Sequence, residues 1–80
     1  MAKVIFTATR EENRARLHLL NRDMEHNAFV VCWNYNPADT TWDWGAYSDT
    51  LIDALSIFVQ KCNEHDFNKV VEGYAEAHEQ

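Results

Sequence analysis

The sequence predicts an α+β fold in which a small antiparallel sheet of three or four strands is covered by helices, in the element order β-α-β-β-α-α. Three observations favour this class. Residues 28–35 are rich in β-branched and aromatic side chains, residues 51–62 carry an apolar stripe with helical spacing, and no segment has the crossover pattern of a parallel nucleotide-binding sheet. Because residues 1–80 contain no linker, internal repeat or low-complexity tract, we expect one domain.

The amino-terminal third contains a short strand and a segment with two interpretations. Residues 3–8 alternate in the manner of a strand. Thr9 and Glu12 have the spacing of a capping box, and the lack of Gly and Pro over 10–25 favours a helix there. The competing interpretation is a half-buried strand, because polar and apolar residues alternate over 14–19.

A β-hairpin is predicted for residues 28–47. The first strand, 28–35, is stopped by Asn36-Pro37, residues 37–40 have turn chemistry, and residues 42–47 resume an extended pattern after a loop of about six residues. Alternation predicts one face made of Phe29, Val31, Trp33 and Tyr35, another made of Val30, Cys32 and Asn34, and a shared face for Trp42 and Trp44. The hairpin is therefore apolar on both sides.

Two helices are predicted after the hairpin. Ser48 or Asp49 can cap the first, whose apolar stripe consists of Leu51, Ile52, Leu55, Phe58, Val59 and Cys62. Asp66 can cap the second, whose stripe consists of Phe67, Val70, Val71, Tyr74 and Ala75. Gly73 weakens the second helix.

The charge of the chain is unevenly distributed. The net charge is −6: residues 1–22 hold five Lys and Arg against two Glu, which gives +3, and residues 23–80 hold two Lys against eleven carboxylates, which gives −9. This balance disfavours binding to nucleic acid or to an anionic membrane and favours a protein partner with a basic surface. Two cysteines in apolar surroundings, and an amino terminus without the pattern of a signal peptide, predict a cytoplasmic protein.

Signatures of catalysis and of cofactor binding are missing from the sequence. The two glycines, Gly45 and Gly73, form no phosphate-binding loop, and no nucleophile elbow or H-E-x-x-H helix occurs. Cys62-x-x-His65 is one short-spaced pair of metal-ligating residues, whereas structural zinc needs four ligands, usually as two pairs. We therefore expect no enzyme activity, no cofactor and no metal.

The candidate binding residues are the aromatic and acidic side chains around the hairpin. They are Tyr35, Trp42, Trp44 and Tyr47 together with Asp39, Asp43, Asp49 and Asp53. Trp and Tyr are enriched at binding hot spots, and carboxylates spread over a surface can imitate phosphates toward a nucleic-acid-binding protein. The alternative is structural: the rings fill the interior on both sides of the sheet, and the acids cap helices and keep the surface soluble.

The runs Val30-Val31-Cys32-Trp33-Asn34-Tyr35-Asn36-Pro37 and Trp42-Asp43-Trp44-Gly45-Ala46-Tyr47, followed by a helix with Asp53-Ala54-Leu55 and Phe58, resemble small acidic proteins encoded by bacteriophages and mobile elements. The resemblance covers about half of the chain. Some proteins of that origin are anti-CRISPR inhibitors, so the resemblance implies an inhibitor that occupies a basic surface of a host nucleic-acid-processing complex. The alternative function is a non-enzymatic assembly homodimer built on the aromatic hairpin.

Overall fold

A computed structural model describes residues 2–11 and 15–73 of the chain. Five strands and one helix follow one another as β1 (Lys3–Thr9), β2 (Leu17–Asn21), β3 (Phe29–Trp33), β4 (Gly45–Ser48), α1 (Leu51–Glu64) and β5 (Lys69–Glu72). The strands form one antiparallel sheet in the order β4-β3-β2-β1-β5. The protein is thus mostly sheet with a single described helix, and the predicted α+β class, with its order β-α-β-β-α-α, is wrong.

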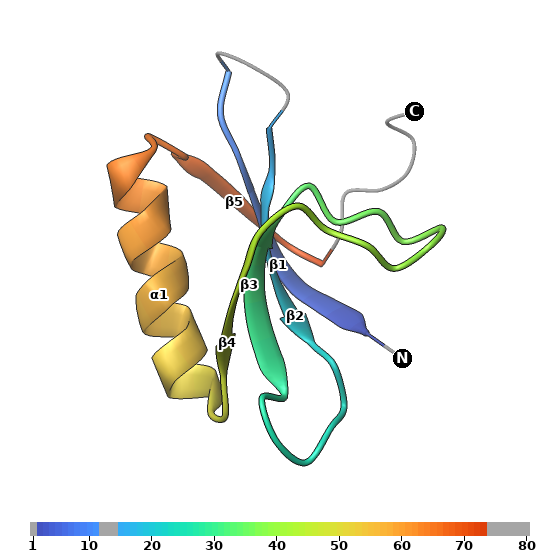
Figure 1. Ribbon diagram of the computed structural model, residues 1–80. Helices are drawn as coiled ribbons and strands as arrows, with labels where there is room; N and C mark the ends of the chain where they lie inside the picture. The colour runs from blue at the N-terminus through green and yellow to red at the C-terminus, as the bar shows by residue number, and fades with distance from the viewer. Residues whose placement is uncertain (1, 12–14, 74–80) are drawn as a thin grey trace.

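The connection from β4 to β5 determines how the sheet is covered. β1 to β4 form a meander in which each strand pairs with the next, whereas β5 pairs with β1 at the far edge. Since β4 and β5 are opposite edges, the chain must cross the whole sheet between them, and it does so as α1 on one face (Figure 1). α1 lies over β2, β3 and β4.

Residues 17–21 form the interior strand β2, so the helix predicted over 10–25 is wrong in the part that the structure describes, and the competing strand interpretation is right there. Leu17 and Leu19 pack against α1, while Leu20 packs on the opposite side of the sheet, and all three are buried. A helix would bury one stripe only, so burial of successive residues on two faces overrides helix propensity. Thr9, the predicted cap, is the last residue of β1.

The hairpin and the first predicted helix are confirmed. β3 and β4 pair antiparallel, and α1 spans the predicted stripe. The cap of α1 is Thr50, whose side chain accepts a hydrogen bond from the backbone N–H of Asp53, rather than Ser48 or Asp49. The face of α1 that is buried contains Ala54, Phe58 and Cys62, which shifts it away from Ile52 and Val59 of the predicted stripe.

The second predicted helix is replaced by the edge strand β5. Asp66 takes a left-handed backbone conformation (φ 59°) just after α1, and the Phe67 N–H donates to the Cys62 carbonyl, so Asp66 ends one helix instead of starting another. Val70 and Val71 then pair with Ala8 and Thr7 of β1. The remaining residues of the predicted helix, Tyr74 and Ala75, lie outside the described residues.

Two hydrophobic clusters lie on opposite faces of the sheet. We call the face under α1 the helical face; its buried sheet residues are Ala8, Leu17, Leu19 and Val31. We call the opposite face the loop face; its buried apolar residues are Leu20, Val30, Cys32 and Tyr35, with Trp42 packed against them. Along β3 the predicted alternation of Val31 and Trp33 with Val30 and Cys32 is confirmed. No helix in the described part of the chain is long and apolar enough to cross a membrane.

Two substitutions separate the observed strand from the predicted helix. Leu19 is fully buried, whereas Met24, which would lie on the apolar stripe of a helix over 10–25, is 50% exposed in the turn that follows β2. Leu19→Ala should lower the free energy of unfolding by about 2–5 kcal/mol and Met24→Ala by less than about 0.5 kcal/mol, as measured by urea denaturation. Equal losses for the two variants would contradict the strand.

Candidate functional site

The end of β3 turns the chain onto the loop face. Asn34 has a left-handed backbone (φ 55°), a conformation that asparagine tolerates better than most residues. Its N–H donates to the Arg16 carbonyl, and its side-chain oxygen accepts from the Arg16 N–H at 3.0 Å, which fixes the turn to the segment before β2. As a result Tyr35 lies on the loop face with Cys32, and not on the helical face with Trp33 as strict alternation predicts.

A β-bulge separates the two tryptophans of the second hairpin strand. The Trp33 N–H donates to the Trp44 carbonyl at 3.2 Å, and the Asp43 N–H donates to the Trp33 carbonyl at 3.1 Å, so one residue of β3 opposes two residues of its partner. Trp42 consequently reaches Tyr47 on the loop face, while the Trp44 ring lies under Lys61 of α1. The predicted common face for Trp42 and Trp44 is wrong because of this bulge.

Three rings stand together on the loop face beside β4. Ring centroids are 6.0 Å apart for Tyr35 and Trp42 and 6.4 Å apart for Trp42 and Tyr47, and the Trp42 indole donates a hydrogen bond to the Tyr47 hydroxyl at 3.2 Å. The Arg22 guanidinium lies 4.9 Å from the centre of the Tyr47 ring. Tyr35 is buried and Trp42 is half-buried, but Tyr47 is 46% exposed, so the cluster presents one ring to solvent.

Gly45 makes room for these rings. A Cβ atom at this position would lie 2.9 Å from the Trp42 Nε1 atom, 3.0 Å from a Val30 methyl carbon and 3.3 Å from the Tyr47 hydroxyl. Any side chain at position 45 would therefore displace Trp42 from Tyr47. Asn34, Gly45 and Arg22 shape the site, yet sequence reasoning did not select them. Asn34 next to a strand end was the one recoverable signal, since asparagine is enriched in left-handed positions.

Two of the four predicted aspartates lie in the hairpin loop, which we define as residues 34–44 (Figure 1). Asp39 accepts a hydrogen bond from the Thr41 hydroxyl at 2.7 Å, and Asp43 accepts one from the Asn34 side-chain amide at 3.1 Å. Both carboxylates are thus held by the loop itself while they remain exposed. The loop closes through the pairing of Asn36 with Thr41.

The other two aspartates lie at the opposite end of β4. Asp49 accepts a hydrogen bond from the Asn27 N–H at 2.6 Å, and Asp53 occupies the first turn of α1, where a carboxylate is favoured by the helix dipole. Trp44 and the four residues of β4 separate Asp43 from Asp49, a span of at most about 20 Å in an extended strand. The structure therefore divides the predicted set into a hairpin-loop group with Tyr35, Trp42 and Tyr47, and a helix-start group.

A buried polar pair lies on the loop face at the centre of the sheet. The Thr7 hydroxyl donates to the Gly73 carbonyl at 2.7 Å, so it accepts from His18 Nδ1 at 3.1 Å, which places the imidazole proton on Nδ1. Burial lowers the pKa of His18 from 6.5 to about 4, with a smaller contribution from the nearby Arg16. His18 is therefore neutral in the folded protein at physiological pH, and Thr7 links β1 to the end of β5.

The two cysteines are separated by the sheet. Cys32 belongs to the loop face and Cys62 projects from α1 onto the helical face, both as free thiols. Burial raises the pKa of Cys32 to about 12 and raises that of Cys62, which keeps both thiols protonated. Within residues 2–11 and 15–73 no group of three or more His, Cys, Asp or Glu side chains is arranged to hold a metal ion.

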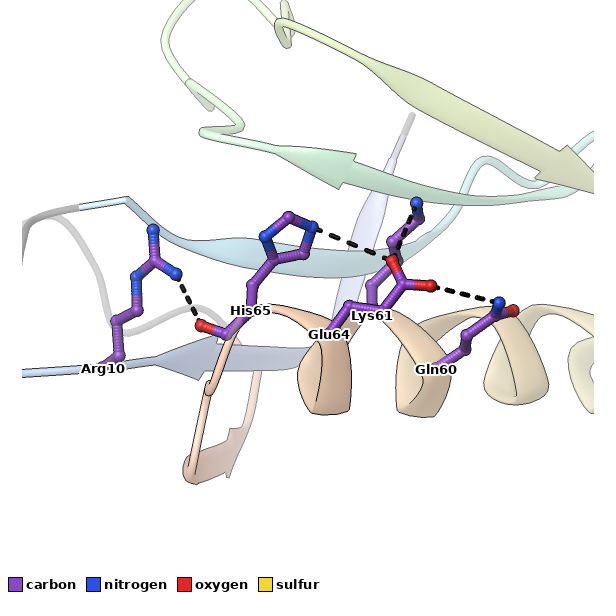
Figure 2. Close-up of polar contacts among 5 residues, drawn as sticks. All are labelled: Arg10, Gln60, Lys61, Glu64 and His65. Atoms are coloured by element: carbon purple, nitrogen blue, oxygen red, sulfur yellow. Dashed lines mark hydrogen bonds and ion pairs between the residues drawn. The ribbon is translucent and has the colours of Figure 1, made fainter.

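The polar groups at the end of α1 stabilise the crossover. Figure 2 shows Glu64 at the centre, where it accepts a hydrogen bond from Gln60 at 3.2 Å, pairs with Lys61 at 3.4 Å and lies 3.9 Å from His65. Arg10, just after β1, donates to the His65 carbonyl. The Arg10 hydrogen bond joins the end of the helix to the residue that follows β1, while the contacts of Glu64 are local to the helix end.

Rings at the same end of the sheet reinforce this junction. His65 packs edge-on against Trp33 at 5.1 Å, Trp33 lies 5.3 Å from the buried Phe67, and the Arg10 guanidinium lies 4.7 Å from the Phe67 ring. The Cys62-x-x-His65 pair is therefore split: the thiol points into the hydrophobic cluster and the imidazole covers an indole.

No protein-family model, no curated protein and no solved structure matches this chain.

The buried His18 makes stability depend on pH. Its folded pKa of about 4 lies below the unfolded value of 6.5, so the unfolded chain binds the proton first and stability falls as the pH drops from about 6.5 to 4. The loss should approach about 3 kcal/mol at pH 4. NMR titration of the His18 ring should show protonation only near pH 4, and urea denaturation of wild type and of the exposed control His26→Gln should show the same loss. Protonation of His18 near pH 6.5 would refute this assignment.

Proposed function

We propose that this protein is a non-enzymatic binding module that engages a basic surface of a protein partner through the hairpin loop and the adjoining Tyr47 ring. The observation that supports the proposal is the exposed Tyr47 ring, held by Trp42 and Arg22, next to a hairpin loop that contains Trp42 and that fixes the exposed carboxylates of Asp39 and Asp43.

The aromatic part would supply most of the affinity. Binding costs conformational entropy when mobile side chains are immobilised, and a ring that is already fixed loses little. Tyr47 is fixed by the hydrogen bond from Trp42 and by the Arg22 guanidinium over its face. The Arg22 contact also shows that the ring accommodates a guanidinium, which is the group that an arginine-rich partner would present.

The acidic part would set the partner class and the rate of encounter. Asp39 and Asp43 are exposed, and residues 23–80 carry most of the negative charge of the chain. Carboxylates repel a phosphate backbone and attract lysine and arginine, so a basic protein groove is favoured over nucleic acid itself. Attraction of this kind accelerates association and weakens as salt is added.

The resemblance of the hairpin to small phage-encoded proteins gives the proposal a first target class. A host nucleic-acid-processing complex of the CRISPR type has a basic channel for nucleic acid. In this proposal the hairpin loop occupies such a channel and inhibits the complex by stoichiometric occupancy. The test is whether the purified chain lowers DNA binding by a complex of this class in proportion to its concentration.

Charge reversal tests the binding surface. The partner is captured on immobilised full-length protein from a lysate of the source cells, purified, and its affinity measured for each variant. Asp39→Lys/Asp43→Lys should weaken binding at least about tenfold near 0.05 M salt and less at high salt. Tyr47→Ala should weaken it by about 30-fold, which corresponds to the loss of about 2 kcal/mol.

Glu72→Lys is the matched control, because Glu72 is exposed on β5, the edge strand on the opposite side of the sheet from β4 and the hairpin loop. It should leave the affinity unchanged. If the double variant binds as tightly as wild type, the acidic surface has no role in recognition and the proposal fails.

A further inference from the structure

The described residues cover only part of the helical face of the sheet. Five strands about 4.8 Å apart span roughly 19 Å, whereas a helix with its side chains is about 10 Å wide, so two helices are needed to cover such a face. The chain supplies α1, which lies over β2, β3 and β4. Beside it, toward β1 and β5, runs a groove of about 340 Å³ with a wholly apolar lining of Phe6, Leu55, Phe58, Val59, Cys62 and Val70.

The flank of α1 that borders this groove is itself an exposed apolar ridge. Ile52 is 78% exposed and Val59 is 54% exposed, and with Leu55 between them they have the i, i+3, i+7 spacing of a helix-packing seam. Val70 of β5, on the other wall of the groove, is 49% exposed. A ridge and a groove of matching chemistry therefore lie side by side on one face.

Charge distinguishes this face from the rest of the molecule. The chain carries a net charge of −6, so two copies repel one another over most of their surfaces. Residues 54–60 of α1 contain no ionisable side chain, and the pair Lys61 and Glu64 lies toward the Trp44 side of the helix. Lys69 and Glu72 of β5 cancel. The centres of protein–protein interfaces are depleted of charged residues in the same way.

We propose that a second copy of this chain docks on the helical face, with the α1 helix of each copy lying in the groove beside the α1 helix of the other. The arrangement is self-complementary, because the described residues of each copy provide one helix and leave room on the sheet for another. A twofold axis that runs between the helices and along them places the two sheets on opposite sides and makes the helices parallel, so that Ile52 and Val59 of one copy lie near the same residues of its partner. The sheets then enclose the two helices as a common middle layer.

This inference is independent of the proposed partner-binding function, since Tyr47 lies on the loop face and the groove on the helical face. Within the hairpin, β3 is an interior strand with Val30, Val31 and Cys32 fully buried, so a homodimer built on the hairpin would have to use the edge strand β4. The homodimer that we propose lies at α1 and β5 instead.

Sedimentation equilibrium of the full-length protein from about 1 to about 200 μM tests the proposal, because this range brackets a dissociation constant in the micromolar range. Wild type should approach twice the monomer mass at the upper end, with a midpoint of thermal unfolding that rises with concentration. Val59→Glu should stay monomeric and lose the concentration dependence. Glutamate is a good helix former and Val59 is exposed, so circular dichroism should show an unchanged fold.

Tyr47→Glu is the control, with a matched charge on the opposite face. It should dimerise as wild type does and lose only the partner binding proposed above, so the two proposals can fail separately. A wild-type chain that remains monomeric at 200 μM would overturn the dimer and leave the groove to a helix of another protein. Dimerisation that survives Val59→Glu would overturn it too, since association would then use another surface.

Discussion

The rest of this structure depends on one constraint: the sheet has two apolar faces, and residues 2–11 and 15–73 provide one helix to cover them. β3 is apolar on both sides, and β2 buries leucines on both sides, so neither face can be left to water. The single helix is committed to one face because it must cross from β4 to β5, the two edges. Each face is therefore completed in a different way.

The loop face is completed by the hairpin loop. Asn34 in its left-handed conformation and the bulge opposite Trp33 redirect Tyr35 and Trp42 onto the loop face, where they cover Cys32 and its neighbours. The edge of this cover is Tyr47, which packs on one side and meets solvent on the other. The ring proposed for recognition thus stands at the edge of the side chains that cover the loop face, and its packing against them restrains it.

The helical face is completed only over β2 to β4. α1 is too narrow to reach the far edge, so the apolar residues of β1 and β5 are left beside an apolar flank of the helix. Because one helix cannot cover both faces, the hairpin loop covers the loop face, and the groove stays open on the helical face. Self-association through α1 would cover the groove without a partner of another kind.

The sequence predicted correctly the elements whose hydrophobic pattern fits only one type of secondary structure. The hairpin and α1 were predicted because their runs are long and their periods clear. β2 was open to both interpretations, since helix-forming composition and strand alternation coincide over 14–19, and only long-range burial decides between them. β5 was mistaken for a helix because four residues, Lys69–Glu72, are too few to separate a period of two from one of 3.6.

The sequence predicted which types of residue form the candidate site, but not which of these residues lie together on one face. The rings and acids chosen from the sequence do surround β4, but the backbone angle of Asn34 and the bulge decide which face each ring takes, and no local spacing reports either. Asp39 and Asp43 remain with the rings, while Asp49 and Asp53 stabilise the turn and helix at the other end of the strand.

The measurement that tests this account most directly is backbone NMR of residues 66–72 against β1. If β5 completes the sheet, backbone protons of Val71 and Val70 should show cross-strand contacts to Thr7 and Ala8, their partners in the register. Sequential amide contacts of a helix through 66–72, with none to β1, would contradict it, because a second helix would then be available and the shortage that shapes both faces would not exist.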